Sequence, residues 1–256
     1  LRWDANGNRD RLVQWAGSGI ERWGGMDYDA QGRLGVSGYF ENELQVLDTQ
    51  WVATGKQDAF VAILDPELDS LLWVKQVGEG AFVQGADLVF SSMGQWVLAG
   101  AFEGGMVLQG DSLQSSQPGS DLFLVSWNTS GEEVWSQTLT GSQEDRAIAL
   151  WADPQSDKVW LAGTLRGRLR SREQVEIQSA DLNEDGFVYA VNALGQTQLF
   201  FPLNDPGTEQ VTDMQGEAGY LYLCGRFSGS FQLGGTLLNA PAGDVFGFVA
   251  RYDTVG

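Results

Sequence analysis

Histidine is absent from this chain of 256 residues, and cysteine occurs once, as Cys224. Without imidazole, the chain cannot form a Ser-His-Asp or Cys-His catalytic unit, a histidine metal site or a histidine-based pH switch. A single cysteine cannot form an internal disulfide, and Cys224 lies in the apolar segment 220–224, where we expect a buried, unreactive thiol. These two absences exclude histidine-dependent chemistry and disulfide stabilisation within the chain.

Basic residues are scarce, and long hydrophobic runs are missing. Fifteen lysines and arginines stand against 34 aspartates and glutamates, which gives a net charge of −19 and a pI near 4.1. Such a charge repels phosphate backbones and anionic lipids, so we expect neither nucleic acid nor a membrane surface as a partner. The longest apolar runs, such as 122–125, are far shorter than the ~20 residues of a membrane-spanning helix, so no membrane span is expected. Hydrophobic residues still make up 43% of the chain, which is enough for a folded core.

The most informative feature present is a tandem repeat, marked by three short motifs in register. The first motif is a segment of five mostly apolar residues with a glycine at its centre, and the four glycines are 62, 63 and 62 residues apart: Gly38, Gly100, Gly163 and Gly225. The second motif begins with an aspartate, spaced by 63, 64 and 59 residues: Asp58, Asp121, Asp185 and Asp244. The third is a segment with aromatic residues, at 72–75, 134–137 and 199–202.

Each repeat has the pattern of short β-strands. Runs rich in Val, Leu, Phe, Tyr and Trp alternate with Gly, Asn, Asp and Ser turns, and no stretch keeps a helical period. In the second copy the pattern predicts strands near 86–90, 95–101, 122–127 and 133–138, with a separate hairpin within 104–120. Units of four antiparallel strands without helices pack radially as the blades of a β-propeller. The sequence therefore predicts an all-β fold, a β-propeller of four repeats of about 62 residues.

The phase of the repeat suggests how such a ring closes. We expect a single domain over residues 1–256, with blades at about 18–78, 79–141, 142–207 and 208–256 plus 1–17. The last blade lacks a fourth strand, whereas segment Arg11–Ala16 matches a fourth strand with no blade of its own. Pairing this N-terminal strand beside Phe246–Tyr252 would close a four-bladed ring and remove an exposed sheet edge. The competing possibility is a slice of a larger ring.

The repeat carries a family resemblance. Its order is Gly-x-Phe, an excursion, Asp-x-Phe-Val, Asp-x-x-Gly and then Leu-Trp-x-x-Gln, best matched by segments 58–65 and 72–76. This order resembles the bacterial β-propeller repeat of secreted and surface proteins, often called the SBBP repeat. The resemblance spans all four copies and is weakest in the third and fourth. It implies a propeller in an exported setting, which is extracellular, cell-surface or periplasmic, and it implies no defined reaction.

One segment has the opening of a calcium loop. Asp181, Asn183 and Asp185 alternate before Gly186, and hard oxygen ligands at alternate positions with a glycine at the bend suit Ca²⁺. The twelfth position is Asn192 instead of the bidentate glutamate of an EF-hand. Asp185 is also a repeat aspartate whose counterparts lie in no such loop. We therefore favour a structural turn and expect no cofactor, with calcium as the alternative.

Three aspartates fall near the middle of the predicted innermost strand: Asp27, Asp87 and Asp213. Innermost strands line the central channel of a ring, so these carboxylates could gather on one axis and attract a cation. The third copy has Ala149-Leu150 instead, which leaves the set incomplete. Solvated channel residues are the favoured interpretation.

The third repeat holds a local cluster of positive charge at alternate positions: Arg166, Arg168, Arg170 and Arg172. On one strand this spacing places all four side chains on one face. The cluster would form a docking ridge for an acidic protein or polyanionic glycan, because arginine binds carboxylate and sulfate bidentately. The alternative is local balancing of acids such as Glu173 and Glu176, or protection of an edge strand by charge.

These observations favour a noncatalytic, exported scaffold or recognition module that binds a protein or glycan through its rim or face. One alternative is a carboxylate-dependent polysaccharide hydrolase or lyase, which a cluster of acids and tryptophans in one pocket would support. A further alternative is a structural subunit of a cell-surface assembly. Fold alone does not decide among these functions.

Overall fold

The computed structural model describes residues 2–3, 5–79, 82–108, 110–115, 119–181, 183–217, 219–233 and 235–254. These residues form antiparallel β-sheets joined by turns and contain no helix. The prediction of an all-β fold is confirmed.

Each repeat folds into one principal sheet. In the first three sheets the strand order follows the chain, and the predicted strands of the second copy are confirmed with small changes at their ends. The first sheet contains β4 (Glu21–Tyr28), β5 (Leu34–Phe40), β8 (Asp58–Leu64) and β9 (Leu71–Val77). The second contains β10 (Phe82–Phe90), β11 (Gln95–Glu103), β14 (Asp121–Asn128) and β15 (Glu133–Gly141). The third contains β16 (Arg146–Ala152), β17 (Val159–Arg166), β20 (Glu184–Val191) and β21 (Thr197–Leu203), and the fourth β22 (Gly207–Glu217), β23 (Tyr220–Leu233) and β25 (Phe246–Asp253).

A small hairpin extends each sheet between its second and third strands. The hairpin expected within 104–120 is present as β12 (Gly105–Leu108) and β13 (Asp111–Gln114). The other repeats have β6 (Glu43–Val46) with β7 (Thr49–Val52), β18 (Arg168–Arg170) with β19 (Glu176–Gln178), and β24 (Thr236–Asn239) with the end of β23. Hairpin β18–β19 also reaches back to the preceding sheet, where β18 pairs with the end of β15.

The repeated glycines and aspartate motifs meet across the middle of each sheet. In the first three repeats the repeated glycine lies on the second strand opposite the aromatic residue of the Asp-x-Phe motif on the third strand. In the fourth repeat Gly225 lies opposite Phe248, two residues beyond the aromatic residue of the motif. The ring covers the glycine so closely that a Cβ would collide with it or with the backbone of the innermost strand. The four pairs are Gly38–Phe60, Gly100–Phe123, Gly163–Phe187 and Gly225–Phe248. The spacing of these two motifs therefore has a packing cause.

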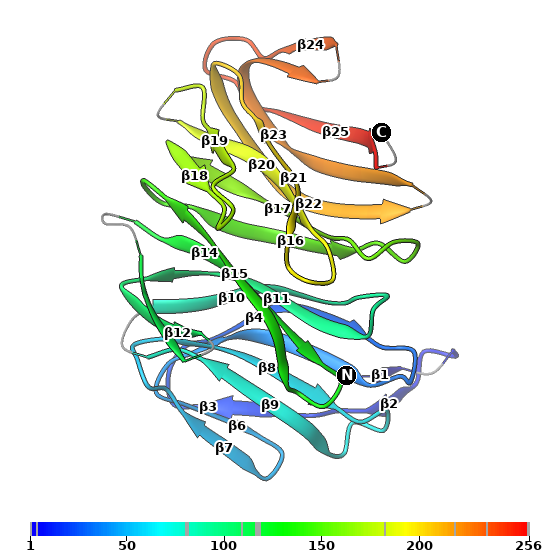
Figure 1. The fold of residues 1–256 in the computed structure, drawn as a ribbon. Coiled ribbons are helices and arrows are strands. Elements are labelled where there is room, and N and C mark those ends of the chain that lie inside the picture. The colour runs from blue at the N-terminus through cyan, green and yellow to red at the C-terminus, as the bar shows by residue number, and fades with distance from the viewer. Residues whose placement is uncertain are drawn as a thin grey trace.

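The four sheets stack face to face in chain order, from the first sheet at the bottom of Figure 1 to the fourth at the top. A buried apolar cluster fills each interface between neighbours. The third sequence motif contributes to two of these interfaces: the indole of Trp73 lies against Gly131 and donates to the carbonyl of Thr129 in the next sheet, and Trp135 lies against Gly195 one sheet further on.

The expected closure by the N-terminal strand is wrong. Segment Arg11–Ala16 contributes to β2 (Arg9–Arg11) and β3 (Trp15–Gly17); β2 pairs with β1 (Arg2–Trp3), and β3 pairs with β6. These hydrogen bonds hold the segment on the first sheet, at the opposite end of the stack from β25. Within the described part of the chain, β25 pairs with β23 and with no second strand. The stack is therefore open at both ends.

Candidate functional site

The residues of the alternative calcium loop, Asp181, Asn183 and Asp185, make hydrogen bonds within the turn that precedes and begins β20. The side chain of Asp181 accepts hydrogen bonds from the backbone and side-chain amides of Asn183, at 2.7 and 2.8 Å. Asp185 is buried at the start of β20 and accepts from the amide of Ala180. The described residues contain no group of three or more Asp, Glu or Cys side chains that could hold a metal ion. These contacts fit the structural turn.

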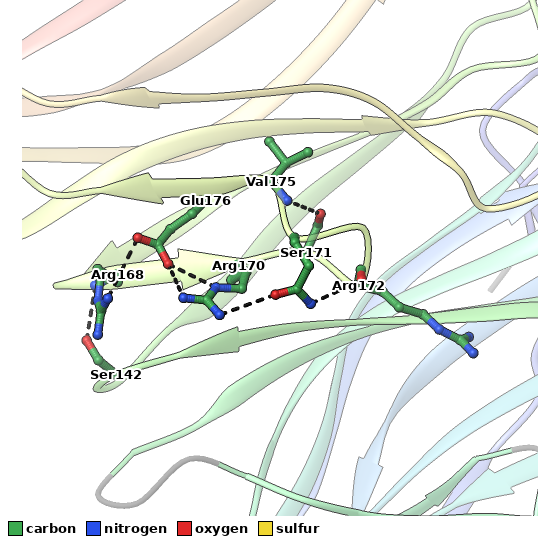
Figure 2. Close-up of polar contacts among 8 residues, drawn as sticks. Ser142, Arg168, Arg170, Ser171, Arg172, Val175 and Glu176 are labelled. Atoms are coloured by element: carbon green, nitrogen blue, oxygen red, sulfur yellow. Dashed lines mark hydrogen bonds and ion pairs between the residues drawn. The ribbon is translucent and has the colours of Figure 1, made fainter.

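The four arginines of the third repeat do not share one strand face, so that expectation is wrong. Gly167, with a φ of +78°, separates Arg166 at the end of β17 from β18, and Arg172 lies in the turn after β18. Figure 2 shows Arg168 and Arg170 on the same side of the hairpin, while the guanidinium of Arg172 extends away from them.

Glu176 on the partner strand lies beside this pair of arginines. Its carboxylate is 2.6 Å from Arg170 and 3.8 Å from Arg168 (Figure 2). The hydrogen bond from Arg170 lowers the pKa of Glu176. The arrangement matches the alternative of local charge balancing, because the two adjacent guanidinium groups already have a carboxylate partner.

Asp27, Asp87 and Asp213 meet in one cavity of about 390 Å³, which the innermost strands of all four sheets line. Two of them cap backbone amides of the next sheet: Asp27 accepts from the amide of Phe90, and Asp87 from that of Leu150, both at 2.7 Å. Burial raises the pKa of Asp87 to about 6; the bonds from Leu150 and Leu88 oppose this rise, and the charges of Asp213 and Asp27 add to it. The carboxylates of Asp27 and Asp87 therefore join neighbouring sheets.

The best candidate for ligand binding is a separate cavity of about 550 Å³, which the first three sheets line near the start of their innermost strands and which we call the end cavity. The exposed indole of Trp23 and the partly exposed rings of Tyr39 and Phe82 supply its aromatic surface. Its exposed polar groups are Arg22, Gln84, Glu103, Glu144 and Arg146.

The end cavity is built from equivalent positions of three repeats. Arg22, Gln84 and Arg146 occupy the same place near the start of the innermost strands, and each pairs with the residue that follows the repeated glycine of the second strand. That residue is Tyr39 in the first sheet and Ala101 in the second, so the smaller side chain leaves room in the second sheet. Sequence reasoning missed these residues, although their spacing of 62 and 62 was available as a signal.

Charges in the end cavity are partly balanced and partly buried. Arg146 makes an ion pair of 2.5 Å with Glu144, and Gln84 donates to Gln57 at 2.8 Å. Asp145 lies at the wall of the cavity and is fully buried; burial raises its pKa to about 8, against the hydrogen bond from the amide of Arg166. A protonated Asp145 adds no negative charge at neutral pH.

The buried acid has a counterpart outside the end cavity. Glu209 holds the equivalent position one sheet further on, directly before Gln210 as Asp145 is before Arg146, and it is also fully buried. Burial raises the pKa of Glu209, and the nearby charge of Asp185 adds to the rise. The raised pKa of Asp145 is therefore a repeated consequence of packing between sheets.

Neither protein-family models nor curated protein sequences contain a match to this chain. Among the residues described above, no helix is long and apolar enough to cross a bilayer.

Proposed function

We propose that the four stacked sheets are blades of a β-propeller and that the protein is a noncatalytic, exported recognition module that binds a neutral oligosaccharide in the end cavity. The SBBP-like repeat supports the propeller and the export. The convergence of the innermost strands on one axial cavity also supports the propeller.

The end cavity is the observation that carries the binding function. Aromatic rings such as Trp23 and Tyr39 present apolar faces on which a sugar ring can stack, and such rings prefer a partly wet environment. Arg22 and Gln84 lie beside them with exposed polar groups that can bond hydroxyl groups. A concave site with aromatic walls and a few convergent polar groups is typical of small-ligand binding. The cavity carries both positive and negative side chains, which favours a neutral ligand.

A carboxylate-dependent hydrolase or lyase is the second candidate, because Glu103, Glu144 and Asp145 all line the end cavity. An acid with a raised pKa would suit proton donation to a glycosidic oxygen. However, Asp145 shares its burial and its raised pKa with Glu209, which does not line the cavity. We therefore assign Asp145 to packing and the cavity to recognition without catalysis.

Calorimetric titration with cellohexaose, xylohexaose and mannohexaose tests the proposal. We expect at least one of these to bind, and Gln84→Ala and Tyr39→Ala each to weaken binding about tenfold or more, because each removes a contact that the bound sugar uses. Gln198→Ala is the matched control, since Gln198 is an exposed glutamine on β21 far from the cavity, and it should leave the affinity unchanged.

Three results would count against this function. Binding by none of the three hexasaccharides, or equal affinity in the Gln84→Ala and wild-type proteins, would contradict recognition in the end cavity. Release of new reducing ends during incubation, abolished by Asp145→Asn, would establish the hydrolase instead. Circular dichroism of each variant confirms that the fold is retained.

A further inference from the structure

The two ends of the stack expose side chains whose counterparts are buried. Met26 on β4 is 70% exposed, while the residues at its position in the other three sheets, Leu88, Leu150 and Met214, are 1%, 5% and 4% exposed. Val249 on β25 is 79% exposed, whereas Val61, Leu124 and Val188 at its position are each fully buried. In every interior interface, the face that carries the Val249 position packs on the face of the next sheet that carries the Met26 position.

The exposed face of the first sheet is a wide apolar groove of about 600 Å³. Met26 and Tyr28 of β4 form one side of it, and Leu34 and Val36 of β5 continue it. A face of this kind on a folded chain commonly marks an interaction site. The fourth sheet exposes its other face, the one that carries the Val249 position, and Val249 and Tyr222 are exposed on it.

Carboxylates on the innermost strands also distinguish the first sheet from the fourth. The innermost strands alternate at the residue before the Met26 position: Gly25, Asp87, Ala149 and Asp213. In the second sheet Asp87 caps the amide of its own Leu88 and the amide of Leu150 in the third sheet, which has no carboxylate of its own.

In the fourth sheet Asp213 caps the amide of its own Met214, while its second oxygen accepts no hydrogen bond from any residue in the described ranges. The equivalent amide that follows a residue without a carboxylate is that of Met26, in the first sheet. A first sheet placed after the fourth would therefore continue the alternation and give Asp213 the partner that Leu150 gives Asp87.

Strand β3 of the N-terminal segment occupies the place of a fourth strand from another sheet. Gly17 and Ala16 of β3 pair with Leu44 and Gln45 of the first sheet's hairpin. In the same register, Gly141 and Thr140 of β15 pair with Leu169 and Arg170 of the third sheet's hairpin. Strand β15 is the fourth strand of the preceding sheet, so β3 occupies the place of a fourth strand belonging to a sheet before the first. Among the described residues the fourth sheet has no such strand, and one edge of β25 is unpaired.

We infer that two copies of this chain associate head to tail, with the fourth sheet of each copy stacked on the first sheet of the other. In each interface Val249 meets the apolar groove, Asp213 caps the amide of Met26, and segment β2–β3 adds to the open edge of β25. Because the four innermost strands of one chain line a common axial cavity, the stack curves, and the two interfaces close a ring of eight sheets.

The net charge predicts how the association responds to salt. Each copy carries a charge of −19, so two copies repel each other over a distance that shortens as salt is added. Sedimentation equilibrium should give a dimer of twice 27.9 kDa, and its dissociation constant should fall as the salt concentration rises.

Substitutions at the exposed ends test the interface without disturbing the fold. Met26→Asp and Val249→Asp should each yield a monomer, because each buries an unpaired charge in both interfaces of the ring. Leu194→Asp is the matched control, since Leu194 is 69% exposed in a turn of the third sheet, and this variant should remain dimeric. Asp213→Asn should weaken the dimer about a hundredfold, because it removes one hydrogen bond to a charged group, worth about tenfold, from each of the two interfaces.

A mixture of the two charged variants distinguishes the head-to-tail arrangement from one in which like sheets pair, the first with the first or the fourth with the fourth. The intact fourth sheet of Met26→Asp and the intact first sheet of Val249→Asp can still pair, so the mixture should regain a dimeric mass. A monomeric wild-type protein at all salt concentrations would overturn the proposal. A dimer unaffected by Met26→Asp, or an open-ended series of larger species, would overturn it as well.

Discussion

Replacing Trp96 with alanine is expected to lower the free energy of unfolding by about 3–5 kcal/mol, which is the range for truncating a fully buried tryptophan. Trp96 is the largest fully buried side chain among the described residues, and it lies on β11 against Phe90, with ring centroids 4.8 Å apart. Its ring also covers Gly35 of the first sheet, where a Cβ would collide with it. The substitution therefore opens a cavity in the interface between two sheets. Urea unfolding at constant pH measures the loss.

The matched control is Trp23→Ala. Trp23 is 54% exposed and stacks edge-on with Trp15 at 5.0 Å, so its removal should cost about 1 kcal/mol. Similar losses in the two variants would show that Trp96 is not enclosed between the first and second sheets.

Asparagine in place of Asp145 is expected to raise the free energy of unfolding at pH 8 by about 1–3 kcal/mol and to weaken its dependence on pH. Burial raises the pKa of Asp145 from 3.8 in the unfolded chain to about 8 in the fold. The folded protein therefore binds more protons than the unfolded chain between these values. Its stability is highest below pH 4 with respect to this group and is lost as the pH rises through 8. Asparagine keeps the acceptor for the amide of Arg166 and carries no charge at any pH.

Thermal unfolding between pH 5 and pH 8 measures the effect. The wild-type midpoint should fall as the pH rises, and Asp145→Asn should reduce the slope. Asp48→Asn is the control, since Asp48 is exposed on the turn between β6 and β7, and it should follow the wild type. A wild-type midpoint that rises with pH over this interval, or equal slopes for Asp145→Asn and wild type, would contradict the burial of a protonated Asp145.

The strand content and the repeat were predictable because their motifs report local packing. A glycine opposite a phenylalanine is needed in each sheet, as Gly100 and Phe123 show, and both therefore recur at a fixed spacing. The repeat aspartate is similarly constrained: Asp58 accepts hydrogen bonds from the backbone amides of Thr54 and Gly55 and ends the hairpin of the first sheet. Residues that are constrained by such local contacts therefore recur at regular intervals in the sequence.

The features that failed depend on contacts that spacing does not encode. Alternation of the arginines predicted one strand face, but the positive φ of Gly167 breaks the strand after Arg166. The N-terminal strand matched a fourth strand correctly in pattern, yet its pairing with β6 places it on the first sheet. The end cavity depends on side-chain size at equivalent positions, such as Ala101 against Tyr39, and becomes visible only when three sheets are placed together.

Amide hydrogen exchange of Asp87→Ala tests whether the repeats form equivalent sheets stacked face to face in chain order. Asp87 on β10 caps the amide of Leu150 on β16, a residue 63 positions away in another sheet. We expect the Leu150 amide to exchange at least about tenfold faster in this variant, because it loses a charge-assisted hydrogen bond. The amide of Phe90, which Asp27 caps, should keep its protection. An unchanged exchange rate at Leu150 would contradict the stacking of the second sheet on the third.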